Sequence, residues 1–353
     1  MHPSRASVDS RLPFDPGVAH PARVYNYWLG GKDHYEADRA AGDEVARRRP
    51  HVVAGARANR AFLARAVRYL AGDCGVRQFL DIGIGLPAPG STHELAQQAA
   101  PGSKVAYVDN DPLVLVHARA LLTSGPQGRC GYIGADLRDP GAILAQASAT
   151  LDFAQPVAVL LLAILHFLAA ADDPAGIVAA LARALTPGSY LVISHLTADF
   201  APGQVGTAVE AYNAAVPGGV TARGHAEVTA LFGGLPLVPP GVVPIAQWRP
   251  AAPVRPVSPD ADLYAGIVRT PPHSCASTTR LGAARSACRP GTSSPTPGPG
   301  RPPGPRLDGS TRRPPGSAGE PARAPSRQRS GIPLRVGAEV DSSSGAWAGC
   351  ASS

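Results

Sequence analysis

Carboxylates and glycines carry most of the chemistry that this sequence suggests. The stretch FLDIGIGLPAPGSTHE places Asp81 two residues before Gly83 and four before Gly85, at the end of a short apolar run. Glycines that follow a strand let the backbone approach a ligand closely. A carboxylate beside them attracts a cationic group and repels a phosphate. The stretch therefore predicts a binding loop for a small molecule that carries positive charge.

The same glycines formally match a dinucleotide fingerprint, Gly83-x-Gly85-x-x-Ala88. Two features argue against a dinucleotide. The Pro-Ala-Pro-Gly run at 87–90 separates the glycines from the next helix, so no helix N-terminus lies ready for a pyrophosphate. Asp81 would also repel that group. The fingerprint alone is therefore a weak signal.

Two further carboxylates end strand-like runs later in the chain. Asp109 ends VAYVD, 24 residues after Gly85, and Asp136 follows GYIGA. A carboxylate can accept two hydrogen bonds from a ligand. Asp111 and Asp139 each precede a proline and are typical helix N-caps. Because Asp111 and Asp139 are expected to cap helices, Asp109 and Asp136 remain available to bind a ligand.

Two histidines and a tyrosine lie near the ends of later strands. His166 lies in LLLAILHFL after the fourth strand-like run, and His195 follows the fifth. A lone histidine is either a structural hydrogen-bonding group or a general base. The structural role is favoured for both, and more strongly for His195. Tyr212 is a candidate lining residue of a substrate pocket, on the basis of its position after the fifth strand-like run alone.

The elements that must position these residues alternate between strands and helices. A Ser-x-x-Glu capping box opens one helix at Ser91, and Asp-Pro pairs open others at Asp111 and Asp173. An amphipathic helix is predicted at 59–70. A further helix is predicted at 226–232. The alternation indicates an α/β fold with a doubly wound parallel sheet, and the last two runs suggest a hairpin at its edge. The strand-like runs are 78–82, 104–108, 131–134, 157–162, 189–194, 235–243 and 263–268.

An aromatic segment near the start, YNYWLGGKDHY, resembles a phosphate loop only superficially. Asp33 follows Lys32 where a phosphate loop needs Ser or Thr, and no strand precedes the segment. We interpret 21–76 as a helical lid over the ligand pocket, with the double glycine as its hinge. A helix-turn-helix packing device is the equal alternative. The candidate lid contacts are Tyr25, Gly30, Gly31, Lys32 and Asp33.

Composition separates the end of the chain from the rest. Residues 271–353 hold eleven Arg and no Lys against four acids, so the whole net charge of +7 lies there. The segment has no periodic apolar pattern, and we expect it to be disordered, as we expect for residues 1–20. A basic tail can touch nucleic acid. An unselected extension, from a frameshift or readthrough in GC-rich DNA, is favoured.

Several classes of protein are disfavoured by what the sequence lacks. Cys74 and Cys130 have no CxxC partner, which argues against a zinc site or a disulfide framework, and we expect no metal. The N-terminus has no signal-peptide pattern, and the longest apolar run, 156–171, is shorter than a membrane span. Residues 1–270 are neutral overall, which argues against nucleic acid as a partner. A cytoplasmic location is expected.

The order of these motifs resembles that of methyltransferases that use S-adenosylmethionine (SAM), a sulfonium compound without phosphate. More narrowly, residues 21–269 resemble the S-adenosyl methyltransferase family of GC-rich bacteria, formerly a domain of unknown function. The segments that carry this resemblance are ARVYNYWLGGKDHYEADR, ANRAFLARAVR, QFLDIGIGLP, YVDNDPLVLVHARALL, LHFL, PGSYLVISH and PGVVPIAQWRP.

The resemblance implies a Rossmann-like sheet of seven strands with the last one antiparallel, spanning a SAM-binding domain at 77–270. It implies a small-molecule methyl acceptor, because the Asn/Asp-Pro-Pro-aromatic motif of nucleic-acid enzymes is missing after the fourth strand. His166 is the candidate catalytic residue. A catalytically silent protein that binds SAM or S-adenosylhomocysteine (SAH) is the alternative, and the oligomeric state stays open. The implied cofactor contacts are Asp81, Gly83, Gly85, Asp109, Asn110, Asp136 and Leu137.

Overall fold

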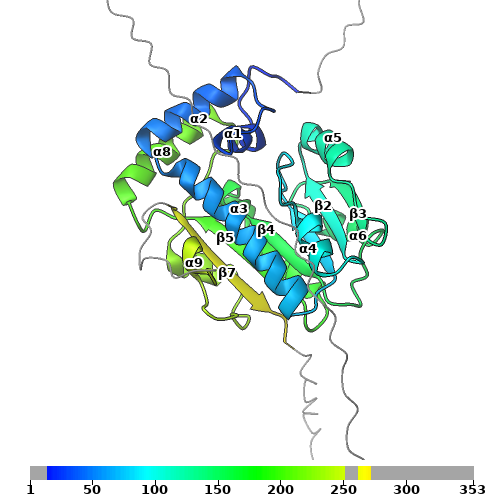
Figure 1. Cartoon of the computed structure of the whole chain (residues 1–353). Helices are drawn as coiled ribbons and strands as arrows, with labels where there is room; N and C mark the ends of the chain where they lie inside the picture. The colour runs from blue at the N-terminus through cyan, green and yellow to red at the C-terminus, as the bar shows by residue number, and fades with distance from the viewer. Residues whose placement is uncertain (1–13, 251–260, 272–353) are drawn as a thin grey trace, which may run out of the picture. The chain divides into compact units, whose positions relative to one another are not determined.

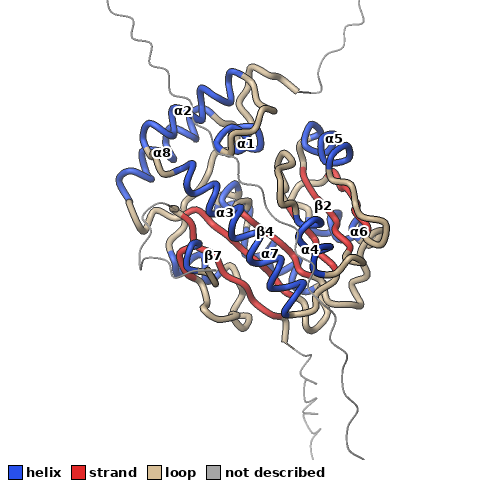
Figure 2. Tube along the Cα trace, viewed as in Figure 1, coloured by secondary structure: helices blue, strands red, loops and turns tan. Residues whose placement is uncertain are grey.

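The computed structural model describes residues 14–250 and 261–271, which contain a seven-stranded sheet and the helices around it (Figures 1 and 2). The predicted tail at 271–353 lies outside the described residues, apart from Pro271. The strands are β1 (Gln78–Ile82), β2 (Lys104–Asp109), β3 (Arg129–Gly134), β4 (Ala158–Leu162), β5 (Tyr190–Leu196), β6 (Val243–Pro244) and β7 (Leu263–Arg269). The α-helices are α1 (Pro21–Trp28), α2 (Glu36–Arg48), α3 (Val52–Arg68), α4 (Thr92–Ala99), α5 (Pro112–Leu121), α6 (Pro140–Ala147), α7 (Pro174–Arg183), α8 (Pro202–Ala215) and α9 (His225–Ala230). Short helical turns are η1 (Tyr69–Asp73), η2 (Leu165–Phe167), η3 (Ala170–Asp172) and η4 (Ile245–Gln247).

The strand order is β3-β2-β1-β4-β5-β7-β6, with the first five strands parallel and β7 antiparallel to β5. The chain reverses its direction of winding between β1 and β4. In open sheets of this kind, ligands bind at the carboxyl ends of the strands beside such a switch point. This confirms the predicted Rossmann-like sheet with its antiparallel last strand.

Helices cover both faces of the sheet because the central strands are apolar on both sides. One face packs against α3, α4 and α5 through side chains such as Phe62, Leu95 and Ala118. The other packs against α6, α7 and α9 through side chains such as Ile143 and Val178. All five residues of β1 are buried. The binding-loop residues that follow β1 are therefore attached to the most protected part of the fold.

The helices of the parallel half begin at the caps that the sequence indicates. The carboxylate of Glu94 accepts the backbone N–H of Ser91 at 3.1 Å, as a capping box requires. Asp111 accepts the N–H of Leu113 at 2.8 Å at the start of α5, and Asp139 accepts that of Ala142 at the start of α6. Each cap fixes the point where a loop at the sheet edge turns into a helix.

Helices α1, α2 and α8 form a separate layer beside the sheet (Figure 1). They share a small apolar cluster that includes Val24, Val45 and Tyr212. Helix α8 is more than 150 residues from α2 in sequence, so only the tertiary fold brings them together. Helix α8 therefore packs against the segment 21–76, which the sequence analysis interprets as a lid.

Two stretches differ from the sequence-based expectation. Residues 235–243 do not form a full strand: Leu237 makes one isolated antiparallel bridge with Val268, and only Val243–Pro244 forms β6. The pair Pro239–Pro240 lies between them, and proline has no N–H to donate to a ladder. Of the predicted disordered segment 1–20, residues 14–20 are described and carry contacts. The side chain of His20, for example, caps α1.

Candidate functional site

A cavity of about 820 Å³ opens at the carboxyl ends of β1, β2, β3 and β4, and residues of α1, α2, α3 and α8 line its other side. Its volume lies near the upper end of the range for small-molecule sites. All seven cofactor candidates of the sequence analysis line it. They are Asp81, Gly83, Gly85, Asp109, Asn110, Asp136 and Leu137.

Both glycines of the first loop have a backbone conformation that favours glycine. Gly83 has φ +75°, and a Cβ there would lie 2.5 Å from Cδ1 of Ile164. Gly85 has φ +63°, and a Cβ there would meet no atom within 4 Å. Gly83 therefore allows close packing of the loop after β4. Gly85 instead leaves open space on the cavity side, which a ligand can fill.

Asp81 is a buried carboxylate that faces the cavity from the end of β1. The hydroxyl of Thr92 donates to its Oδ2 at 2.6 Å. Burial raises the pKa of Asp81 to about 6, although the Thr92 hydrogen bond and the charge of Arg60 act against the rise. A cationic ligand would relieve this cost. The site therefore fits an ammonium or sulfonium better than a phosphate.

Asp109 is the second buried carboxylate, at the end of β2. Its Oδ2 accepts the N–H of Gly85 and its Oδ1 accepts the N–H of Asp111, both at 3.0 Å. Burial raises the pKa of Asp109 to about 6 in spite of these bonds. Each oxygen keeps a second lone pair for a ligand donor. The geometry fits the pair of hydroxyls that a ribose presents.

Asp136 is half-buried, and its side chain has partners within the protein. Its Oδ1 accepts the N–H of Arg138 at 2.8 Å, and its Oδ2 accepts the side-chain amide of Asn110 at 3.2 Å. The guanidinium of Arg138 lies 3.4 Å away. Asn110 and Asp136 thus form a polar pair across two strand ends. A base edge would bind to this pair rather than to a single carboxylate.

Arg60, on α3, is a cavity residue that the sequence analysis did not identify, although it lies in the helix predicted at 59–70. Its Nη2 donates to the carbonyls of Pro89 and Gly90 at 3.2 and 3.0 Å. These bonds turn the guanidinium toward the loop after β1, where its charge lowers the pKa of Asp81. Arg60 and Asp81 therefore present opposite charges at one end of the cavity. No local motif signals this, because α3 precedes the sheet.

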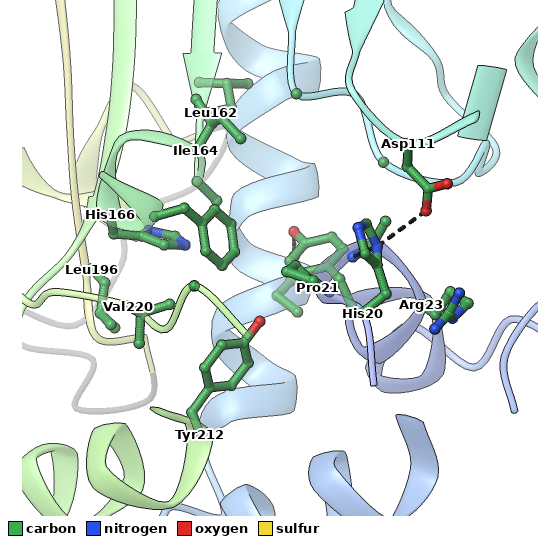
Figure 3. Close-up of a pocket in the computed structure, with 18 of the residues that line it drawn as sticks. His20, Pro21, Arg23, Asp111, Leu162, Ile164, His166, Leu196, Tyr212 and Val220 are labelled. Atoms are coloured by element: carbon green, nitrogen blue, oxygen red, sulfur yellow. Dashed lines mark hydrogen bonds and ion pairs between the residues drawn. The ribbon is translucent and has the colours of Figure 1, made fainter. Parts of the chain in front are cut away.

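His20 is a second cavity residue that the sequence analysis did not identify. Its Nδ1 lies 3.1 Å from Oδ2 of Asp111 (Figure 3). The same nitrogen accepts the N–H of Ala22 at the start of α1. Burial is the main cause that lowers the pKa of His20, and Asp111 opposes it. The pair connects the lid to the loop after β2.

The loop after β4 forms the next part of the wall, and its backbone is held in an unusual conformation. Ala163 has φ +53°, which is rare for a residue with a side chain. Its N–H donates to the hydroxyl of Ser194 at 2.9 Å, and that hydroxyl donates to the side chain of Asn59 at 2.6 Å. Strained backbone of this kind concentrates at functional sites. The loop that carries His166 is thus anchored to β5 and α3.

His166 lines the cavity and is almost fully buried. Its Nδ1 has no hydrogen-bond partner among the described residues. Burial and the charge of Arg223 lower the pKa of His166 well below its ordinary value. The imidazole is therefore neutral and a weak base. This geometry fits a wall or hydrogen-bonding role better than proton removal.

His195 does not line the cavity. Its Nδ1 lies 2.7 Å from the carbonyl of Leu196, and the guanidinium of Arg223 donates to its Nε2 at 2.9 Å. Both nitrogens are engaged, and burial lowers the pKa of His195 to about 4. These contacts fit the structural hydrogen-bonding role that the sequence analysis favours for His195.

The lid candidates divide into two groups. Tyr25 and Tyr212 line the cavity, and Figure 3 shows Tyr212 with its hydroxyl directed toward the cavity. The hydroxyl of Tyr25 donates to the carbonyl of Ala56 at 3.0 Å and accepts the amide of Asn59 at 3.1 Å. In the described part of the chain, the hydroxyl of Tyr212 has no protein partner. Tyr212 is thus the more available of the two.

The double glycine and its charged neighbours lie outside the cavity lining. Gly30 has φ +79° and ends α1, which is a common place for glycine. A Cβ on Gly31 would lie 2.3 Å from the side chain of Asn26. Lys32 is exposed, and the carboxylate of Asp33 lies 3.9 Å from Nδ1 of His117 on α5. This arrangement fits the packing alternative of the sequence analysis better than direct ligand contact.

The described residues place limits on other kinds of site. Within 14–250 and 261–271, no group of three or more His, Cys, Asp or Glu side chains is arranged to hold a metal ion. None of the helices in these ranges is long and apolar enough to cross a bilayer.

The sheet order, the antiparallel β7, the glycine loop and the acids at the strand ends define a Rossmann-like methyltransferase fold. A family model described as S-adenosyl methyltransferase matches residues 7–271. The chain therefore belongs to the S-adenosyl methyltransferase family, and its cofactor is SAM. No protein with a curated description matches it.

Two solved structures are similar over nearly their whole length. One is a DUF574 family protein from Streptomyces avermitilis MA-4680, with 45% identity, a TM-score of 0.70, and coverage of 73% of this chain and 99% of that one. The other is a putative methyltransferase from Thermobifida fusca YX, with 41% identity, a TM-score of 0.69, and coverage of 75% and 100%.

Proposed function

We propose that this protein transfers the methyl group of SAM to a small-molecule acceptor. The observation that carries the proposal is that two sets of residues share one cavity. The acids at the strand ends line it, and so do side chains of α1 and α8. A catalyst of group transfer must hold both reactants in one place, and positioning supplies much of its rate. A protein that only sensed the cofactor would need no further space in the cavity for an acceptor.

The residues fit the parts of SAM in a consistent order. Asp109 would accept hydrogen bonds from the ribose, and the Asn110–Asp136 pair would bind the adenine edge. Gly85 leaves room for the cofactor beside the loop. Asp81 and Arg60 would bind the ammonium and the carboxylate of the methionine part, because a zwitterion needs one group of each sign.

The cofactor, when bound, supplies an electrophilic methyl group. The protein's own residues would orient the acceptor and exclude water. His166 has too low a basicity to remove a proton efficiently near neutral pH, so we assign it to the acceptor wall. The acceptor is a small molecule rather than a nucleic acid, because residues 1–270 carry no net positive charge.

Calorimetry followed by a turnover assay tests the proposal. We expect SAM and SAH each to bind one site per chain with micromolar affinity. SAM incubated with the protein and a panel of small phenols, thiols and amines should then yield SAH. Binding of both compounds without SAH formation from any member of the panel would favour the silent regulatory alternative. Absence of binding would contradict both readings of the site.

A further inference from the structure

Aromatic rings form the wall of the cavity opposite the cofactor loops. The rings of Trp28 on α1 and Phe167 on η2 each lie 6.4 Å from that of Tyr212 on α8. The ring of His166 lies 4.5 Å from Phe167. All four residues line the cavity, and Figure 3 shows His166 and Tyr212 on this side of it. A flat unsaturated molecule gains most from such a wall, since rings pack well in tilted and offset arrangements.

Charged side chains at this end of the cavity bind one another. The guanidinium of Arg49 contacts both oxygens of Asp262, at 2.7 and 3.0 Å. A ligand with a fixed charge would have to compete with this pair. The acceptor half therefore suits a molecule that enters uncharged.

Arg223 is a buried cation behind the same wall, and it is 7% exposed. Its guanidinium donates to the carbonyls of Leu165 and Leu168 at 3.1 and 2.8 Å, and to His195. Among the described residues, no carboxylate lies within ion-pair distance of it. Glu227 acts on it at longer range and is itself bonded to the N–H of Gly224 at 2.8 Å.

The charge of Arg223 reaches the cavity through the loop that it holds. It donates to both ends of the segment that contains His166, and it contributes to the lowered pKa of His166 and of His195. Burial acts in the opposite direction on a phenol, and it raises the pKa of Tyr212 in the same wall. A positive charge that disfavours protonation of an imidazole opposes this rise and favours the ionised form of a hydroxyl. Ammonium groups would be disfavoured there for the same reason.

We propose that the methyl acceptor is an uncharged aromatic compound with an ionisable hydroxyl, a phenol in chemical class, held against the Trp28–Tyr212–Phe167–His166 wall and ionised there by the field of Arg223. This rests on the proposed methyltransferase function. The hydroxyl proton leaves to solvent before transfer. The phenolate oxygen then bonds to the methyl carbon while the carbon–sulfur bond breaks, and its electron pair stays on sulfur, so the two charges cancel. Arg223 acts across the loop as an electrostatic and positioning residue.

The experiment measures the ionisation of 4-nitrophenol bound to the SAH-saturated protein, read from the visible absorption of its phenolate. Saturation with SAH is established first by calorimetry. We expect 4-nitrophenol to bind. Its pKa in the bound state should be about one unit lower in the wild type than in a variant without the charge of Arg223, as one nearby charge predicts at an effective dielectric constant of about 20. The non-ionisable 4-nitroanisole should bind without an absorption change.

Variants separate the charge of Arg223 from its packing. Arg223→Met should raise the pKa of the bound probe by about one unit relative to the wild type, and Arg223→Lys should leave it nearly unchanged. Arg65→Met is the matched control, because Arg65 also donates to two main-chain carbonyls but does not line the cavity or contact its loops. Circular dichroism checks the fold of each variant. If Arg223→Met does not fold, Arg223→Gln, which keeps a hydrogen-bond donor without the charge, replaces it.

Each outcome has a defined meaning. A bound probe whose pKa is the same in the wild type and in the uncharged variant would overturn the proposal, as would failure of 4-nitrophenol to bind the SAH complex at millimolar concentration. Preferential binding of phenyltrimethylammonium would replace the phenol by a cationic acceptor. Failure of SAH itself to bind would instead contradict the proposed function, and the calorimetric step reports this separately.

Discussion

The two halves of the cavity are built from different kinds of segment and carry opposite buried charge. The cofactor half comes from short loops at the ends of β1, β2 and β3, where Asp81 and Asp109 are buried without a cation in contact. The acceptor half comes from α1, α8 and the loop after β4, with the cation Arg223 behind it. Burial raises the pKa of both acids. Burial is also the main cause that lowers the pKa of His166 and His195, and the charge of Arg223 adds to it.

This difference indicates a division of electrostatic work. Unpaired buried charge is costly, and it is retained where a ligand of the opposite sign relieves the cost. On this account the negative half holds a sulfonium and an ammonium, and the positive half favours an anionic oxygen. The two fields would then bring together a cationic donor and an anionic acceptor. The following substitutions test each half separately.

The largest effect is expected from Asp109→Ala. The variant loses a carboxylate that would bond two ribose hydroxyls, and SAH affinity should fall about 100-fold, since bonds to charged groups contribute about 1.5–3 kcal/mol each. Calorimetry measures the change. Asp139→Ala removes a cap outside the cavity lining and should leave the affinity within twofold. Equal effects in the two variants would contradict the role of Asp109. Asp111→Ala should mainly reduce thermal stability.

The next effect is expected from Arg60→Met, and it should depend on the ligand. SAH affinity should fall about tenfold or more, because the carboxylate of its amino-acid part loses a charge-assisted partner. Affinity for 5′-methylthioadenosine, which lacks that part, should not change. Arg68→Met, on the same helix and outside the cavity lining, is the control. A similar loss for both ligands would mean that Arg60 only supports the loop after β1.

The buried acids also predict opposite pH trends for binding and for stability. Cofactor binding needs the carboxylates ionised, so SAH affinity should fall about tenfold between pH 7 and pH 5. Ligand-free stability should change in the other direction. A folded pKa of about 6 against 3.8 unfolded means that the folded state takes up protons between those values. The contribution of each acid to stability therefore decreases as pH rises through that window, by about 3 kcal/mol.

Comparison with Asp81→Asn isolates this effect. The Asn variant should unfold at a higher temperature than the wild type at pH 7, and the difference should shrink as pH falls through 6 and disappear below about pH 4. Thermal unfolding followed by circular dichroism measures both. A wild type that is relatively more stable at pH 7 would show that Asp81 is stabilised in the folded state by a partner, contrary to the account.

The smallest effect is expected in the double-glycine turn. Lys32→Ala should change neither SAH affinity nor stability measurably, because the side chain is exposed and outside the cavity lining. Gly31→Ala should lower the unfolding temperature, because its Cβ would collide with Asn26. Loss of SAH affinity in the Lys32 variant would restore this turn as part of the ligand-binding lid.

The cofactor half is the part of the site that sequence can predict. Asp81, Gly83, Gly85 and Asp109 are fixed by local spacing at the ends of recognisable strands, and all of them line the cavity. The acceptor half depends on contacts between distant segments. Trp28 meets Tyr212 only because α1 packs near α8, and Arg60 reaches the loop after β1 only because α3 crosses the sheet. No local pattern encodes these approaches.

The contacts of the remaining candidates also depend on distant segments. Asp136 pairs with Asn110 from another strand end, and the structural role that the sequence favours for His195 involves Arg223, 28 residues away. Of the two interpretations that the sequence leaves open for the double glycine, the packing one fits a helix end packed on Asn26.

A crystal structure of the SAH complex tests the central claim most directly. The account predicts ribose hydroxyls on Asp109, the amino-acid part between Asp81 and Arg60, and the sulfur directed toward the aromatic wall of Tyr212 and His166. SAH with its sulfur directed away from that wall, or bound outside this cavity, would contradict the account.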